Sequence, residues 1–203
     1  MSAVLITLAA AAGFSLPHAD IRLAEYIQRH TPSSVDKEGI WTAAEVEVFV
    51  DPTGKILECS PKRITGNIEL AGTLCSISIG QKMTPPHDFS GRPVHAASRM
   101  IFAAFPNNTP SPSGRIGRVE NERLEISVRP GGIDWHSIPL LGLQLFIDEK
   151  GAVASCAVVT EVSTEIKNVA CQQASAQRFP ARTGASNQPV PYIRSLIVVF
   201  NAV

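Results

Sequence analysis

The stretch AEVEVFVDPTGKILECSP, residues 44–61, decides the fold of the first half of the chain. It opens with apolar residues at alternate positions, which is typical of a β-strand with one buried face: Val46, Val48 and Val50. Residues 51–54 (Asp-Pro-Thr-Gly) then place Pro and Gly where a tight turn favours their backbone angles. Because a second β-like run follows at residues 56–57, the stretch predicts a β-hairpin.

A helix and a last strand are predicted after this hairpin. Apolar side chains recur at helical spacing from Ile68 to Gln81, although β-branched residues lower the helix propensity of this segment. Pro85 and Pro86 end the helix, and VHAASRMIFAAF (residues 94–105) is read as a long strand. Ahead of the hairpin, DIRLAEYIQRH (residues 20–30) has the spacing of a short amphipathic helix.

The same order of elements recurs in the second half of the chain. LGLQLFIDEKGAVASCAVV (residues 141–159) repeats the hairpin, residues 164–177 are helical in pattern, and YIRSLIVVF (residues 192–200) is the last strand. The distance between matched landmarks stays between 95 and 97 residues for these pairs: Asp51 and Asp148, Gly54 and Gly151, Cys59 and Cys156, Cys75 and Cys171, Pro93 and Pro189, Phe105 and Phe200. Because solenoid repeats usually span roughly 20–50 residues, the longer period predicts two tandem domains.

These patterns give a domain plan. Residues 1–19 are predicted to be a signal peptide, because the uncharged run at residues 3–14 is shorter than the ~20 residues of a membrane span and small residues precede Asp20. The basic residue usual in such a leader is missing, and a buried first helix of a cytoplasmic protein stays open as an alternative. The first module is predicted at residues 20–105, a Pro- and Ser-rich linker at 106–122, and the second module at 123–203. The second module begins with a strand-like piece, Arg123–Val128.

The composition is typical of a globular protein with no net charge. Hydrophobic residues make up 44% of the chain and charged residues 18%, which predicts a packed core. Lys plus Arg and Asp plus Glu are 18 each, so the formal charge is zero and nucleic acid is not expected as a partner. No cofactor is predicted.

Four cysteines fall two per repeat, one on each second strand and one in each helix. Pairing within each repeat joins Cys59 to Cys75 and Cys156 to Cys171. In the chain-entropy model, a disulfide that closes a loop of this length stabilises the folded protein by ~3 kcal/mol. Disulfides also imply an oxidising compartment. Buried free thiols are the alternative, and a four-cysteine zinc site is a further one, although its ligands usually come in close pairs.

The matched segments resemble a known family, the C-terminal domain of TonB. The resemblance rests on FIDEKG (Phe146 to Gly151), RFPA (Arg178 to Ala181), QPV (Gln188 to Val190) and LIVVF (Leu196 to Phe200) in the second repeat. The first repeat keeps FVDPTG and GRPV but has Met83-Thr84-Pro85-Pro86 where the second has RFPA. The resemblance implies an α+β fold of two tandem TonB C-terminal-like modules, each a small antiparallel sheet packed on one helix. The cysteines resemble a variant in which the second strand is bridged to the helix.

The resemblance also implies a periplasmic protein that binds a protein or peptide, such as an outer-membrane receptor segment, by strand addition at the last strand. The residues implied for partner binding are Ala96, Ser98, Met100, Phe102, Tyr192, Arg194, Leu196 and Val198. Arg99 and Arg194 are candidate edge-guarding charges. Burial of these strands, or pairing between the repeats, stays open. Without the membrane anchor and Pro-rich rod of a transducer, energy transduction is not carried over, and no integral membrane protein is expected after processing.

No enzyme is predicted, because the sequence holds none of the Gly-x-Ser-x-Gly, His-Glu-x-x-His or adjacent Cys–His patterns. His87, Asp88 and His95 can be drawn as a metal or base pair, but they are read as surface groups. A structural envelope protein without a peptide ligand and an uncharacterised hydrolase are the alternative functions. Trp41 and Trp135, which precede the two hairpins, are expected to pack under the helices. The sequence leaves the partner's identity and the oligomeric state open.

Overall fold

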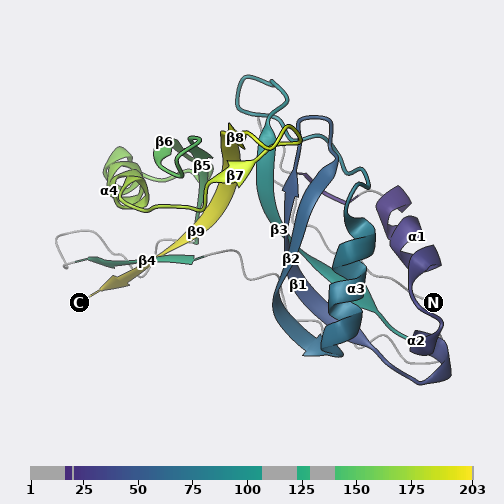
Figure 1. Ribbon diagram of the computed structural model, residues 1–203. Coiled ribbons are helices and arrows are strands. Elements are labelled where there is room, and N and C mark those ends of the chain that lie inside the picture. The colour runs from purple at the N-terminus through teal and green to yellow at the C-terminus, as the bar shows by residue number, and fades with distance from the viewer. Residues whose placement is uncertain (1–16, 20, 107–122, 129–139, 203) are drawn as a thin grey trace. The chain divides into compact units, whose positions relative to one another are not determined.

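The computed structural model describes residues 17–19, 21–106, 123–128 and 140–202, and its first sheet confirms the predicted hairpin (Figure 1). Strands β1 (Thr42–Val50) and β2 (Ile56–Gly66) pair antiparallel from Thr42↔Gly66 to Val50↔Ile56. One carboxylate oxygen of Asp51 accepts hydrogen bonds from the Thr53 N–H, the Thr53 hydroxyl and the Lys55 N–H at 2.7–2.9 Å. This Asx-type turn fixes the register of the hairpin.

The chain divides into two compact units, Met1–Val119 and Glu120–Val203. The described residues form four helices and nine strands, so the fold is mixed α+β with a mainly sheet core. The shortest of these elements are α2 (Ser34–Lys37), β7 (Arg182–Thr183) and β8 (Pro189–Val190). Each unit is described below by itself.

In unit 1, β1 is the central strand between β2 and β3 (His95–Ala104), and helix α3 (Ile68–Ser78) covers one face of this sheet. Helix α1 (Ile21–His30) packs on α3 with Leu23 and Ile27, confirming the predicted amphipathic helix (Figure 1). The core takes the even-numbered side chains of the strands, with the apolar face of α3: Ala44, Val46, Val48, Val50, Met100, Phe102, Leu70, Ala71 and Leu74.

The second face of β1 is also buried, which the alternation of apolar residues did not predict. All nine residues of β1 are buried, including Glu45 and Glu47. Glu45 binds Arg63 at 2.9 Å and Arg99 at 3.1 Å, and Glu47 binds Lys62 at 3.5 Å. Buried carboxylates are tolerated because these cations satisfy them.

Trp41 also belongs to that second face. Its ring stacks on Phe105 with centroids 5.8 Å apart, and it packs against a small cluster of Ala43, Ile101 and Ala103. The expectation that Trp41 packs under the helix is therefore wrong, because odd-numbered positions in this region point away from α3. Trp135 lies outside the described residues.

In unit 2, β5 (Leu141–Ile147) pairs antiparallel with β6 (Val153–Val158) on one side and with β9 (Tyr192–Ala202) on the other. Strand β4 (Arg123–Val128), at the position expected from the sequence, pairs parallel with β9. Helix α4 (Thr164–Ser175) contacts β6 and β4. The unit buries a set of aliphatic side chains and one tyrosine: Ile126, Leu141, Leu143, Leu145, Ile147, Ile166, Tyr192, Leu196 and Val198.

Matching details recur at equivalent places in the two units. Each first hairpin has a bulge before its turn, between Phe49 and Val50 and between Phe146 and Ile147. Asp148 repeats the Asx-type turn through the N–H groups of Lys150 and Ala152. The helices begin with side-chain caps, where Asn67 accepts from the Leu70 N–H and Ser163 from the Ile166 N–H.

Both helices end earlier than their apolar patterns indicated. The segment predicted to Gln81 ends at Ser78, whose hydroxyl bonds to the Cys75 carbonyl while Ile79 takes an extended conformation. The segment predicted to Gln177 ends at Ser175. The side-chain bond of Ser78 competes with the helical ladder and favours the end of α3.

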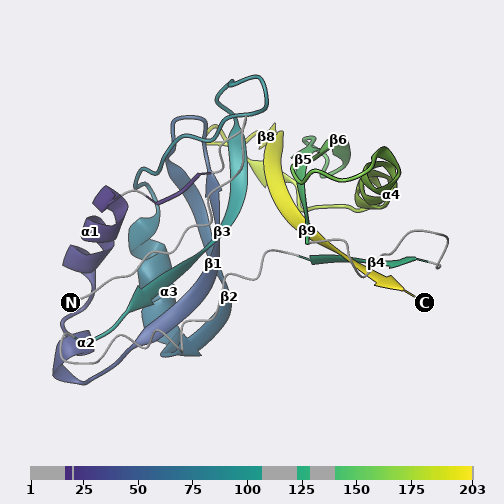
Figure 2. The ribbon, with the colours of Figure 1, turned by 180° about the vertical axis from the view of Figure 1, so that it is seen from behind.

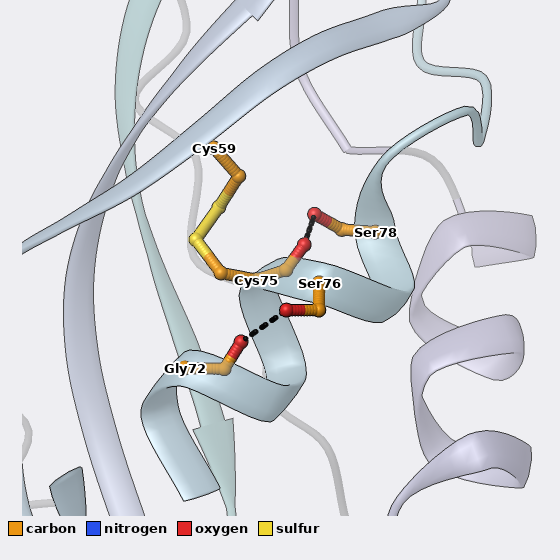
Figure 3. The surroundings of a disulfide bond; sticks show 5 residues. All are labelled: Cys59, Gly72, Cys75, Ser76 and Ser78. Atoms are coloured by element: carbon orange, nitrogen blue, oxygen red, sulfur yellow. Dashed lines mark hydrogen bonds between the residues drawn. A yellow bond between two sulfur atoms is a disulfide. The ribbon is translucent and has the colours of Figure 1, made fainter. Parts of the chain in front are cut away.

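Two disulfides join the second strand of each unit to its helix. Cys59 on β2 is bonded to Cys75 in α3 (Figure 3). The Cα–Cα distance of this pair is 5.4 Å. Cys156 on β6 is bonded to Cys171 in α4 with a Cα–Cα distance of 5.6 Å. The described residues include no free cysteine, so the free-thiol alternative does not apply.

Of the predicted signal peptide, residues 17–19 are described and residues 1–16 are not. Pro17 is buried, and the His18 carbonyl accepts a hydrogen bond from the Thr84 N–H at 3.2 Å. The His18 ring lies 3.1 Å from the Thr84 hydroxyl through its Nε2 atom. The predicted linker at 106–122 lies outside the described residues except for Pro106. In the part of the chain that the structure describes, no helix combines the length and the apolar character needed to cross a membrane.

Gln144 on β5 carries a buried amide with no hydrogen-bond partner for either polar atom among the described residues. It stands 97 residues after Glu47, which binds a lysine instead. Since an unsatisfied buried polar group costs about 1–3 kcal/mol, we expect Gln144→Met to raise the free energy of unfolding by about 1 kcal/mol. Urea unfolding measures this, with the exposed Gln173→Met as a control that leaves stability unchanged. A loss of stability in Gln144→Met would contradict the assignment of an orphaned amide.

Candidate functional site

The last strand of unit 1 is fixed along its whole length by β1. Strand β3 pairs antiparallel with β1 from Val50↔Ala96 to Thr42↔Ala104. The four residues implied for partner binding share the face that carries α3; three are buried and Ser98 is half-buried: Ala96, Ser98, Met100 and Phe102. Their side chains therefore pack within unit 1 and do not form an exposed binding surface.

The last strand of unit 2 has the same arrangement. The side chains of Tyr192, Arg194, Leu196 and Val198 are all buried. The Tyr192 hydroxyl donates a hydrogen bond to the Pro180 carbonyl at 2.9 Å, which ties β9 to the segment before it. These contacts orient the strand and place all four side chains inside the unit.

Arg99 and Arg194, the candidate edge-guarding charges, both contact other side chains of their own unit. Arg194 is 6% exposed, and its guanidinium lies 5.4 Å from the centre of the Phe179 ring. Arg99 reaches Glu45 across the neighbouring strand. Both cations are held by partners far away in the sequence, 15 and 54 residues respectively, so alternation along one strand gave no sign of them.

The segment before each last strand is attached to the hairpin turn in the same way, although its residues differ. The Met83 N–H donates to the Gly54 carbonyl at 2.8 Å, and the Phe179 N–H donates to the Gly151 carbonyl at 2.9 Å. Isolated bridges Lys55↔Lys82 and Ala152↔Arg178 lie beside these bonds. The main chain therefore keeps in unit 1 the contact that the RFPA segment makes in unit 2.

Strand β9 is flanked on both sides. Ile197 and Val198 pair with Gly142 and Leu141 of β5 and also with Arg123 and Leu124 of β4. Strand β5 begins at Leu141, opposite Val198, and residues Val199 to Ala202 of β9 lie beyond it. These residues continue to pair with β4 (Figure 2). The edge of β9 that faces away from β5 thus holds an extended segment of the same chain. The alternation in residues 123–128 predicted a strand but not its partner.

Two titratable residues, His95 at the start of β3 and Asp51 in the turn after β1, affect each other's pKa. The His95 ring stacks on Phe49 with centroids 5.6 Å apart. Burial lowers the pKa of His95 below its ordinary value, although the negative charge of Asp51 opposes this shift. Partial burial by itself raises the pKa of Asp51, but hydrogen bonds from Thr53 and Lys55, together with His95, outweigh it and hold this pKa below its usual range.

These shifts predict a pH dependence of stability. The unfolded chain binds a proton at His95 near its ordinary pKa of 6.5, whereas the folded unit 1 resists it, so stability is full above that pH and falls as the pH drops below it. His95→Phe keeps a ring against Phe49 but cannot bind a proton. We therefore expect its free energy of unfolding to fall less than that of the wild type between about pH 7.5 and about pH 5.5. Urea unfolding at the two pH values measures it. The exposed His30→Phe is the control, and an unchanged slope in His95→Phe would contradict the prediction.

His87, Asp88 and His95, which the sequence allowed as a metal or base pair, do not form a metal site among the described residues. Asp88 accepts hydrogen bonds from the Ser90 N–H and from Arg92 and forms an ion pair with Arg92 at 2.8 Å. Burial raises the pKa of Asp88, but these bonds outweigh it and keep the pKa below its ordinary value. Among the described residues, no group of three His, Cys, Asp or Glu side chains is placed to hold a metal ion.

The last strands are thus paired with strands of the same chain, and the residues implied for partner binding are mostly buried in the core. Comparison of the chain with family models, with curated proteins and with solved structures gives no match.

Proposed function

We propose that the chain is a tandem pair of TonB C-terminal-like modules in the periplasm, which binds an extended segment of an envelope protein by strand addition. A module of this kind recognises its ligand through main-chain hydrogen bonds, and alternate side chains of the ligand supply selectivity. The last strand of each unit is the element expected to take part.

The matched local structure of the two units supports the tandem part of the proposal. Five features recur 95–97 residues apart: the hairpin bulge, the Asx-type turn, the helix cap, the disulfide, and the hydrogen bond from the segment before the last strand to the turn glycine. Such small features depend on particular residues at particular places, and their joint recurrence is most simply explained by duplication of one module.

The two disulfides support the location. Disulfides persist in oxidising compartments such as the bacterial periplasm and are rare in a reducing cytosol. Each one closes a short loop between a strand and a helix, 16 residues in unit 1 and 15 in unit 2. This is the usual way in which small exported domains supplement a limited core.

The observation that carries the proposed mode of binding is the β4–β9 pair. Along Ile197 to Ala202 the edge of β9 accepts an extended segment in parallel orientation, with Leu124 beside Val198 and Ile126 beside Phe200. An edge that accepts one strand through its main chain has the hydrogen-bonding geometry to accept another.

Site-specific photocrosslinking tests this function. Val199, half-buried on the face of β9 turned away from α4, is replaced by p-benzoylphenylalanine in the full chain produced in its native host. Illumination of intact cells is expected to give a crosslink, and mass spectrometry should place it in an extended segment of an envelope protein. The matched control carries the same group at Gln172, which is exposed on α4.

Crosslinks of equal yield from both positions would indicate random collision and reject strand addition at β9. A crosslink from Val199 to a cytoplasmic protein would reject the periplasmic assignment.

A second candidate function is that of a structural envelope protein without a peptide ligand. It is favoured by the same pair of strands, since an edge covered by a segment of its own chain is protected from association. In that case the position at Val199 gives no crosslink to any envelope protein.

A further inference from the structure

Unit 2 contains a strand that its basic architecture does not require. Unit 1 forms the corresponding hairpin, helix, disulfide and last strand, but residues 26–30, which stand 97 residues before residues 123–127 of β4, belong to helix α1. That helix packs on α3 rather than adding to a sheet. Strand β4 is therefore an addition to the module rather than a part of it.

Few side chains hold β4 in place. Ile126 is 5% exposed and Leu124 is half-buried, whereas Arg123, Glu125 and Ser127 are exposed. On the outer face, the Asn201 side chain donates a hydrogen bond to the Glu125 carboxylate at 3.5 Å. Helix α4 also contacts β4. The strand pairs with β9 over six residues through its main chain, in the parallel form that is slightly less stable per residue than the antiparallel one.

We propose that β4 is a resident strand that occupies the partner's place on β9 and has to leave before a partner segment adds there. The proposal rests on strand addition as the function of unit 2. The segment that fits this place is an extended peptide running parallel to β9, with aliphatic residues two positions apart to lie beside Val198 and Phe200, as Leu124 and Ile126 do. Because β4 belongs to the same chain, it competes with such a peptide at a high effective concentration. A partner peptide therefore needs a high affinity for β9 to displace β4.

The test uses the full chain and a synthetic probe, the peptide RLEISV of residues 123–128 with a fluorophore at its N-terminus. Ile126→Asp places a charge at Ile126, the buried side chain among the described side chains of β4 (residues 123–127), and is expected to release the strand. The matched control Ser127→Asp places the same charge on the exposed face of the same strand. If β4 is docked 99% of the time, the released variant should bind the probe about 100-fold more tightly than the wild type and the control.

A locked variant gives the opposite arm. Ser127 and Asn201 are register partners on the exposed face, and neighbouring strands lie ~4.8 Å apart, which is within the range that a disulfide spans. Ser127→Cys with Asn201→Cys is expected to abolish probe binding. Amide hydrogen exchange supplies an independent readout, because Val199 to Ala202 should exchange faster in Ile126→Asp and regain protection when the probe is added.

The proposal is overturned if Ile126→Asp, with its circular dichroism unchanged, binds the probe no better than the wild type. It is also overturned if the locked variant binds the probe as well as the wild type does, a result that does not depend on the folding of Ile126→Asp.

Photocrosslinking from Val199 separates this inference from the proposed function. An envelope partner captured equally by locked and wild-type chains rejects the resident-strand role and leaves the function standing. Probe binding to Ile126→Asp without any envelope partner rejects the function and leaves the resident strand standing.

Discussion

Replacing Cys156 and Cys171 together with alanine is expected to lower the free energy of unfolding of unit 2 by about 3 kcal/mol and to release α4 from the sheet. The disulfide closes a loop of 15 residues, and its loss returns that freedom to the unfolded chain. Few other contacts compensate, because α4 buries only Ile166, Ala170 and Ala174 among its described side chains, and two of these are alanines.

The equivalent change in unit 1 is the matched comparison. Cys59→Ala with Cys75→Ala opens a loop of 16 residues, so the chain-entropy model again gives about 3 kcal/mol. Helix α3, however, buries five residues including Leu70 and Leu74, and α1 packs on it. We therefore expect α3 to stay on its sheet while α4 does not.

Hydrogen exchange resolved to the two helices measures the difference, and thermal unfolding gives the total loss. The amides of α4 should lose protection in Cys156→Ala/Cys171→Ala, whereas those of α3 should keep most of theirs in the unit 1 variant. Reduction of the wild type with dithiothreitol is the control and should reproduce both effects at once. Unchanged protection of α4 after loss of its disulfide would mean that packing alone holds this helix.

The local features of the fold could be predicted from the sequence because they depend on neighbouring residues. The turn at Asp51 needs an acceptor side chain and a glycine three positions later, and both are visible in the sequence. Helix α1 and strand β4 were found for the same reason, since periodicity is a property of a short window.

Features that depend on distant pairing could not be predicted in the same way. The second face of β1 is buried because Glu45 meets Arg63 and Arg99, which come from β2 and β3. A strand that reads as apolar-in and charged-out thus has two buried faces once its neighbours are in place. Trp41 was misplaced for the same reason, since its partner Phe105 lies 64 residues later in the sequence.

The candidate site shows the same division. The last strands were located correctly, but the side chains implied for partner binding are core residues, and Tyr192 and Arg194 are engaged by Pro180 and Phe179. The pairing of β4 with β9 was the main feature that the sequence did not predict, because parallel pairing with a strand about 75 residues later leaves no local signal.

Gly54→Ala is expected to cost at least about 3 kcal/mol of the free energy of unfolding, which is unusually large for the addition of one methyl group. Gly54 has φ +87°, a region that costs other residues roughly 1–2 kcal/mol. In addition, a Cβ atom there would overlap the carbonyl oxygen of Met83, whose own N–H is bonded to the Gly54 carbonyl. The methyl group would thus push away the segment that this bond holds.

Gly91→Ala separates the two contributions to this cost within unit 1. Gly91 has φ +75°, but a Cβ atom there would meet nothing within 4 Å, so we expect a loss of only about 1 kcal/mol. Urea unfolding of the two variants measures the difference, which reports the crowding against Met83 alone. Gly151 repeats the geometry with φ +80° and the Phe179 carbonyl, so Gly151→Ala should destabilise unit 2 as Gly54→Ala destabilises unit 1. If Gly54→Ala and Gly91→Ala lower the free energy of unfolding equally, the segment at Met83 moves aside without cost. The turn glycine would then not anchor the chain ahead of the last strand.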